Sequence, residues 1–133
     1  MQKFTLSAGK DIQASFKAIL EDVLLNESKE SFFEIFTAGS EALQNIVRHT
    51  YHFEKNKEVR IWFEIHKNKI TLFMEDDGPP LRDLSFLNLE RTPNEKGNMG
   101  LNLIKKLTRS FSIEAFEQGN LAILKFVISK MDK

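Results

Sequence analysis

The feature that most limits how this chain can fold is a pair of strand-like runs joined by a very short link. In the first run, Glu58–His66, apolar and polar residues alternate, which is typical of a strand with one buried face. The second run, Lys69–Glu75, has an apolar body, and Lys67-Asn68-Lys69 suits a tight hairpin between them. The sequence therefore predicts an antiparallel sheet that needs a cover on one face.

Helices supply that cover. Apolar residues recur at helical spacing in three places, and a Ser31/Glu34 capping box marks the start of the second helix. The expected helices run from Ile12 to near Asn26, from Ser31 to about Tyr51, and over Met99–Arg109.

Further short strands are expected at both ends of the chain. They span residues 3–7, Phe111–Glu117 and Leu121–Ser129, with a Gln118-Gly119-Asn120 turn between the last two. The order β-α-α-β-β-loop-α-β-β predicts an α+β fold, a two-layer α/β sandwich with helices on one face of a mixed, mostly antiparallel sheet. We expect one domain over residues 1–133.

Composition narrows the classes of function. Lys and Arg together number 19, as do Asp and Glu, so the zero net charge favours no nucleic-acid partner. The absence of cysteine excludes disulfides, thiolate catalysis and Cys-ligated zinc. No apolar run is long enough for a membrane span, and the N-terminus lacks a signal-peptide core, so we expect a cytoplasmic protein without a membrane partner.

The first of three polar clusters lies on the second predicted helix. Glu41 and Asn45 are four residues apart, so their side chains share one face. The Glu suits proton transfer at a phosphoryl group, and the Asn carbonyl oxygen suits Mg²⁺. Taken alone, such a pair is more often a solvated helix face.

The second cluster, Asp76-Asp77-Gly78, closes the second strand of the hairpin. A carboxylate there could accept the exocyclic amine of adenine, and Gly78 would let the backbone approach the base. The competing interpretation is a simple turn, because Asp, Gly and Pro are turn formers.

The third cluster, Gly97-Asn98-Met99-Gly100-Leu101, opens the third helix. Free backbone amides and the helix dipole favour phosphate at that position, although a flexible hinge has the same composition. Between the second and third clusters lies a loop of about residues 78–97 that holds all three prolines, and loops of that length are often lids or binding loops.

The three clusters in this order resemble the motifs of the GHKL (Bergerat-fold) ATPase superfamily. Glu41-Ala-Leu-Gln-Asn45 is similar to its N-box, Asp76-Asp77-Gly78 to the first glycine box, and Gly97–Leu101 to the second. Small size, the N-terminal strand and helix and the short lid resemble, within it, the bacterial anti-sigma factor serine/threonine kinases. The likeness covers essentially the whole chain.

The resemblance implies binding of ATP and Mg²⁺ and an assignment for each motif. Glu41 corresponds to the general base, Asn45 to the Mg²⁺ ligand, and Asp76 with Gly78 to the adenine site. Arg48 corresponds to a basic residue that reaches a phosphate in related histidine kinases. The residues around the phosphates are implied to be Gly97, Asn98, Met99, Gly100 and Leu101.

At the level of the protein, the resemblance implies an anti-sigma factor that sequesters a sigma factor. It also implies ATP-dependent phosphorylation of a Ser or Thr on a STAS-domain anti-anti-sigma partner, and a homodimer. Two departures from the family pattern keep a non-catalytic sequestering module open: Pro80 replaces a frequent second glycine, and Leu121-Ala122-Ile123 lacks a frequent Thr. The ATP-binding half of a histidine kinase is less favoured, because no helical hairpin with a phosphoacceptor His precedes these motifs.

Overall fold

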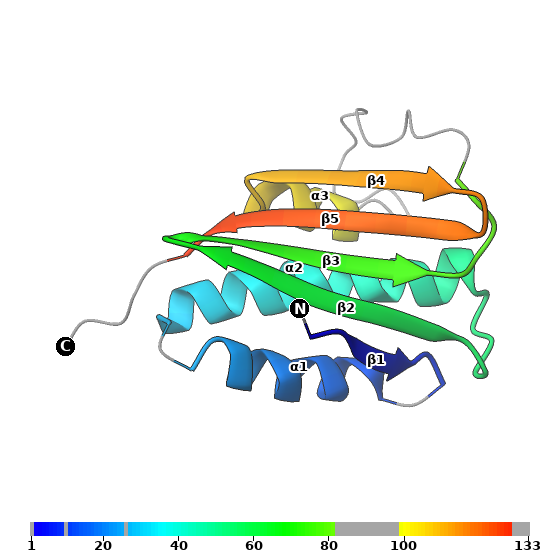
Figure 1. Ribbon diagram of the computed structural model, residues 1–133, viewed down its shortest axis with the longest axis horizontal. Coiled ribbons are helices and arrows are strands. Elements are labelled where there is room, and N and C mark those ends of the chain that lie inside the picture. The colour runs from blue at the N-terminus through cyan, green and yellow to red at the C-terminus, as the bar shows by residue number, and fades with distance from the viewer. Residues whose placement is uncertain (1, 10, 26, 82–98, 129–133) are drawn as a thin grey trace.

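The computed structural model describes residues 2–9, 11–25, 27–81 and 99–128, with the side chain of Met99 left aside. Three helices and five strands follow one another along these segments (Figure 1). In chain order they are β1 (Phe4–Ser7), α1 (Ile12–Val23), α2 (Lys29–Asn45) with a π-helical turn η1 (Ile46–Thr50), β2 (Glu58–His66), β3 (Lys69–Asp76), α3 (Met99–Leu107), β4 (Ser110–Phe116) and β5 (Gly119–Val127).

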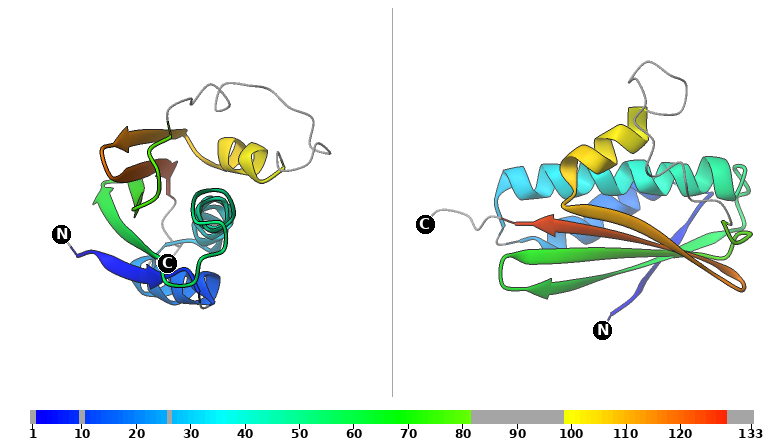
Figure 2. Two further views of the ribbon diagram at one scale, coloured as in Figure 1. Left: turned by 90° about the vertical axis from the view of Figure 1, so that its right-hand side faces the viewer. Right: turned by 90° about the horizontal axis from the view of Figure 1, so that it is seen from above.

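The strands form one sheet in the order β1-β2-β3-β5-β4, and each neighbouring pair is antiparallel. Figure 2 shows the helices together on one side of this sheet. The expected α+β sandwich is therefore confirmed. Within the described residues the sheet is purely antiparallel rather than mixed, because β3 and β5, although distant in sequence, run in opposite directions.

Alternation along the strands determines which side chains enter the core. Inward residues of β2 and β3, such as Ile61 and Leu72, are fully buried against Phe16 of α1 and Leu43 of α2. On the opposite face, the ring of Trp62 stacks on Phe73 at 5.2 Å, and the Lys3 ammonium lies 4.3 Å from the Trp62 ring centroid. Neighbouring side chains thus partly cover Trp62.

The predicted start of the second helix is wrong by one turn. The helix begins at Lys29, and the Oγ of Ser28 accepts a hydrogen bond of 3.1 Å from the Ser31 amide. Ser31 is buried inside the helix instead of capping it. Either serine satisfies the preference for a hydroxyl at an N-cap, and the structure uses the earlier one.

The predicted turn between the last two strands is also displaced. Strand β5 begins at Gly119, so Gly119 and Asn120 belong to the sheet, and Asn120 lies opposite Asp76 in the β3–β5 register. This displacement brings Asn120 to the end of β3.

No helix within the described segments is long and apolar enough to cross a membrane.

Candidate nucleotide-binding site

Two packing contacts connect the described parts of the three polar clusters, one between Glu41 and Gly100 and one between Thr50 and Gly78. Helix α2 ends at Asn45, strand β3 ends at Asp76, and helix α3 begins at Met99. Figure 1 shows the ends of α2 and β3 close together on the side where the β4–β5 turn also lies. The antiparallel order and the helix directions therefore gather residues that are far apart in the sequence.

Glu41 joins the first cluster to the third. The position that a β-carbon would take at residue 100 is filled by the Oε2 atom of Glu41. Any other residue at position 100 would push the carboxylate of Glu41 out of this position. The N-box helix and the Gly-rich helix start, inferred separately from sequence, are thus in direct contact.

Asn45 is the last α-helical residue of α2 and is half-buried, one turn beyond Glu41. The helix then widens into η1, where Arg48 and His49 are exposed. Single π-helical turns are frequent at functional sites, because they change the direction of the side chains that follow. Arg48 is therefore available to solvent at the same end of α2.

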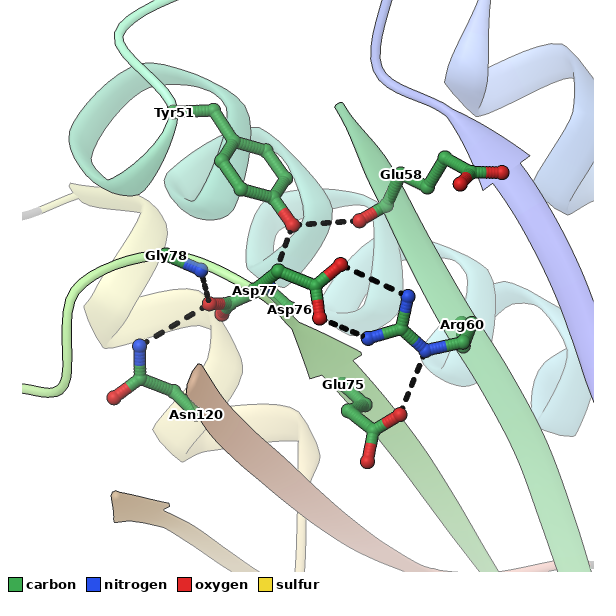
Figure 3. Close-up of polar contacts among 8 residues, drawn as sticks. All are labelled: Tyr51, Glu58, Arg60, Glu75, Asp76, Asp77, Gly78 and Asn120. Carbon is green, nitrogen blue, oxygen red and sulfur yellow. Dashed lines mark hydrogen bonds and ion pairs between the residues drawn. The ribbon is translucent and has the colours of Figure 1, made fainter. Parts of the chain in front are cut away.

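Asp76 has almost no solvent exposure, at 3%. Its Oδ1 atom accepts hydrogen bonds from the Gly78 amide at 2.9 Å and from the Asn120 side-chain amide at 3.1 Å (Figure 3). Burial raises the pKa of Asp76, while the two hydrogen bonds act in the opposite direction. A buried carboxylate held by directed donors is a typical element of a recognition site.

Gly78 is required by the packing of the turn after β3. A β-carbon at this position would overlap the Cγ2 atom of Thr50 in η1 and would lie 3.2 Å from Oδ1 of Asp76. The end of the N-box helix therefore packs directly on the Asp-x-Gly segment.

Tyr51 and Arg60 fix the backbone beside Asp76. The Tyr51 hydroxyl donates to the Glu58 carbonyl at 2.6 Å and accepts from the Asp77 amide at 2.8 Å. The Arg60 guanidinium contacts both carboxylate oxygens of Asp77 at 3.0 and 2.5 Å and bonds Glu75 through Nε at 2.7 Å (Figure 3). Arg60 lowers the pKa of Asp77, chiefly through these hydrogen bonds.

Sequence reasoning missed Asn120, which is 2% exposed and contacts three groups of the site. Its Nδ2 atom donates to Asp76 Oδ1 and, at 3.0 Å, to the Pro79 carbonyl, while its Oδ1 accepts from the Leu81 amide at 2.8 Å. The available signal was a polar residue directly after the hairpin glycine. It was missed because Asn120 was assigned to the turn.

Two of the predicted site residues, Gly97 and Asn98, lie outside the described residues, as does most of the 78–97 loop. Of the rest of the third cluster, Gly100 is half-buried and Leu101 is buried. The structure therefore brings Glu41 and Gly100 together, and Asp76 together with Gly78.

The donor set at the end of α2 fits Mg²⁺ better than a softer metal. Asn45 and Glu41 offer oxygen atoms one helical turn apart, which suits a hard cation that retains waters and shares phosphate oxygens. In the described segments, no group of three or more His, Asp or Glu side chains could hold a metal by itself. A cation here would depend on Asn45 and on a bound phosphate.

Comparison with known families matches this arrangement. The model of the histidine kinase-like ATPase domain matches residues 5–126, which is most of the chain. The chain therefore belongs to the histidine kinase-like ATPase domain family, as its N-box and glycine-box motifs indicated.

Among individual relatives, the chain is 28% identical over 104 residues to the anti-sigma F factor of Clostridium novyi, covering 75% of this chain and 73% of that protein. The solved RsbU and RsbW domains of a Mycobacterium tuberculosis protein superpose with a TM-score of 0.68 at 18% identity. That match covers 99% of this chain but 33% of the other. A blue-light activated histidine kinase domain from Erythrobacter litoralis gives 0.57 at 15% identity, covering 92% and 61%. The two structural matches show the fold.

Proposed function

We propose that this protein is an anti-sigma factor with ATP-dependent serine/threonine-protein kinase activity, acting as one ATPase domain. The observation that carries the proposal is the contact of the Glu41 carboxylate with Gly100 at the start of α3. A proton acceptor beside a helix start that favours phosphate is the arrangement that phosphoryl transfer requires.

In this proposal the nucleotide lies between the end of β3 and the start of α3. Asp76 accepts the exocyclic amine of adenine, and Gly78 lets the base approach. The phosphates bind at Gly97, Asn98, Met99, Gly100 and Leu101, with Arg48 reaching them from η1. ATP supplies the phosphoryl group, and Mg²⁺ would neutralise charge on its phosphates.

Asn45 would hold this cation through its carbonyl oxygen. Without a cation, the Glu41 carboxylate and a phosphate at the start of α3 would repel each other, because Glu41 of α2 lies beside Gly100 at that helix start. The need to separate these charges supports the assignment of Mg²⁺ to Asn45.

Glu41 would take the proton of the acceptor hydroxyl. As that oxygen forms its bond to the γ-phosphorus, the bond between the γ-phosphorus and the leaving oxygen breaks, and ADP departs. The acceptor in this proposal is a Ser or Thr of a STAS-domain anti-anti-sigma protein, and the sequestered partner is a sigma factor. The similarity to an anti-sigma F factor supports the sigma factor as a partner. The STAS-domain partner and a homodimer are proposed from the family resemblance alone.

The test is phosphate transfer from ATP to STAS-domain proteins of the same genome, followed by mass spectrometry. Wild type should phosphorylate one of them on Ser or Thr, and Glu41→Gln should slow transfer by about 10²–10⁴-fold while retaining nucleotide binding. Glu34→Gln, on the same helix two turns earlier, serves as the matched control and should retain activity.

Three results would contradict the proposal. Undiminished transfer by Glu41→Gln removes Glu41 from the mechanism. A stable complex with a sigma factor, without phosphorylation of any STAS-domain protein, would instead favour the non-catalytic sequestering module. Autophosphorylation on histidine would favour the histidine kinase interpretation.

A further inference from the structure

We propose that Asn120 is a positioning residue that orients Asp76 and makes the site specific for adenine over bases with a carbonyl at the same place. The inference rests on the nucleotide site proposed above and adds a residue to it. It also identifies which carboxylate oxygen of Asp76 meets the base.

The hydrogen bonds of Asn120 fix the orientation of its amide group. Two oxygens, Oδ1 of Asp76 and the carbonyl of Pro79, face one end of the amide, and the Leu81 N–H faces the other. Rotating the amide by half a turn would place oxygen against two oxygens and NH₂ against an N–H. The surroundings therefore permit only the orientation in which Nδ2 donates to Asp76.

This orientation assigns different tasks to the two oxygens of Asp76. Oδ1 already accepts from Asn120 and from the Gly78 amide, so it is engaged as an acceptor. Within the described residues, both hydrogen bonds of this carboxylate end on Oδ1. Oδ2 is therefore the atom that remains for a donor from a base.

Selectivity follows from keeping Asp76 ionised. An ionised carboxylate accepts from an exocyclic amine but repels a ring carbonyl, whereas a protonated carboxyl could donate to that carbonyl. Because the Asn120 amide donates to the charged form, it opposes the effect of burial on the pKa of Asp76. Loss of this donor should therefore relax discrimination between adenine and hypoxanthine.

The other charged and titratable groups near Asp76 are Asp77, Arg60 and Tyr51. Asp77 and Arg60 are paired with each other, and their opposing charges act on Asp76 with opposite sign. Asn120 also forms hydrogen bonds with the backbone of Pro79 and Leu81. The same side chain therefore connects the Asp76 carboxylate to the segment after Gly78.

The experiment is competition of ADP and IDP against a fluorescent N-methylanthraniloyl ADP probe, measured between pH 5 and 8 on the full chain. Wild type should prefer ADP by roughly 10- to 100-fold, since IDP leaves a buried acceptor facing a carbonyl. Asn120→Asp keeps the shape and the acceptor for Leu81 but puts a second carboxylate against Asp76. It should cut the preference at least about tenfold and move the loss of ADP binding to higher pH.

Gln118→Glu is the matched control, because it adds the same charge at an exposed position in the adjacent turn. It should leave both the preference and the pH profile unchanged. Asn120→Ala removes the donor without adding charge and should also reduce the preference. It decides the question if Asn120→Asp fails to fold by circular dichroism.

The outcomes separate this inference from the proposed function. If wild type binds neither ADP nor the probe, the nucleotide site is wrong and the role of Asn120 fails with it. If wild type prefers ADP, and folded Asn120 variants keep that preference and its pH profile, the role of Asn120 is overturned while the site stands. Reduced preference together with a shifted pH profile supports the inference, since a purely structural role would weaken both nucleotides equally.

Discussion

The carboxylate of Glu41 occupies the space in which a side chain at position 100 would begin, so a larger residue at position 100 would have to displace that carboxylate. This relationship joins a candidate general base to a candidate phosphate-binding helix start. It also provides a way to displace the carboxylate without changing Glu41 itself.

The first prediction is that Gly100→Ala separates stability from activity. Its β-carbon would overlap Oε2 at the flexible end of Glu41, and alanine gains up to about 1 kcal/mol over glycine in a helix. The free energy of unfolding should therefore change little, whereas phosphoryl transfer should fall by roughly 100-fold because the carboxylate is displaced. Urea denaturation and transfer from labelled ATP measure the two quantities.

Gly39→Ala is the contrasting variant for this prediction. Its β-carbon would lie 2.5 Å from the Phe16 ring and 3.2 Å from Leu72, inside the core. Overpacking of this kind typically costs about 1–3 kcal/mol, so the variant should lose stability. Equal transfer rates in Gly100→Ala and wild type would show that the position of Glu41 does not matter to the reaction.

The second prediction is that Asp76→Asn stabilises the nucleotide-free protein at neutral pH and abolishes adenine-nucleotide binding. Burial raises the pKa of Asp76 above its ordinary 3.8, so the folded state holds the proton more tightly than the unfolded state. The ionised carboxylate therefore costs folding free energy at pH 7. Asparagine removes that charge but retains an oxygen for Gly78 and Asn120.

The difference in stability between wild type and Asp76→Asn should depend on pH in a definite direction. As pH falls through the raised pKa toward 3.8, wild type becomes neutral at Asp76 and its stability deficit relative to Asp76→Asn should shrink. Asp77 is present in both proteins and cancels in the difference. A constant difference between pH 4 and 7 would show that the pKa of Asp76 is not raised. ADP at 100 times its dissociation constant should add about 2.7 kcal/mol to wild type alone.

How far the sequence could anticipate this site depended on the kind of signal. The positions of Glu41 and Asn45 on a helix and of Asp76 at a strand end were predictable, because helical spacing and strand ends determine where such residues lie, while their roles stay predictions. Gly100 was assigned to phosphate, but its contact with Glu41 depends on how α2 and α3 pack. Asn120 was missed because a Gln-Gly-Asn sequence is typical of a turn, while pairing with β3 extends β5 back to Gly119. The contacts of Tyr51 with Glu58 and Asp77 could not be predicted, because hydrogen bonds between distant segments leave no periodic pattern in the sequence.

The third prediction concerns the metal. With Asn45→Ala, the extra thermal stabilisation that ADP gives in Mg²⁺ compared with EDTA should disappear, because a ligand oxygen is lost. The affinity for ADP with Mg²⁺ should fall roughly tenfold or more. Gln44→Ala, the preceding residue of the same helix, is the control and should retain the difference. A full Mg²⁺ effect in Asn45→Ala would assign the cation to another residue.

The last prediction uses the fact that Tyr51 is the single tyrosine of the chain. Burial raises the pKa of its phenol to about 12, from an ordinary value of 10. The neutral phenol is favoured in the folded state, so this stability is fully present below pH 10 and is lost as pH rises toward 12. Ultraviolet titration should therefore show phenolate near pH 10 in urea but near pH 12 in the native protein.

Tyr51→Phe provides the spectroscopic blank and should itself be destabilised by about 1–2 kcal/mol, because the Asp77 amide loses its acceptor. If the phenol ionises near pH 10 while circular dichroism shows the protein to be folded, Tyr51 does not connect β2 to the segment after β3 in this way.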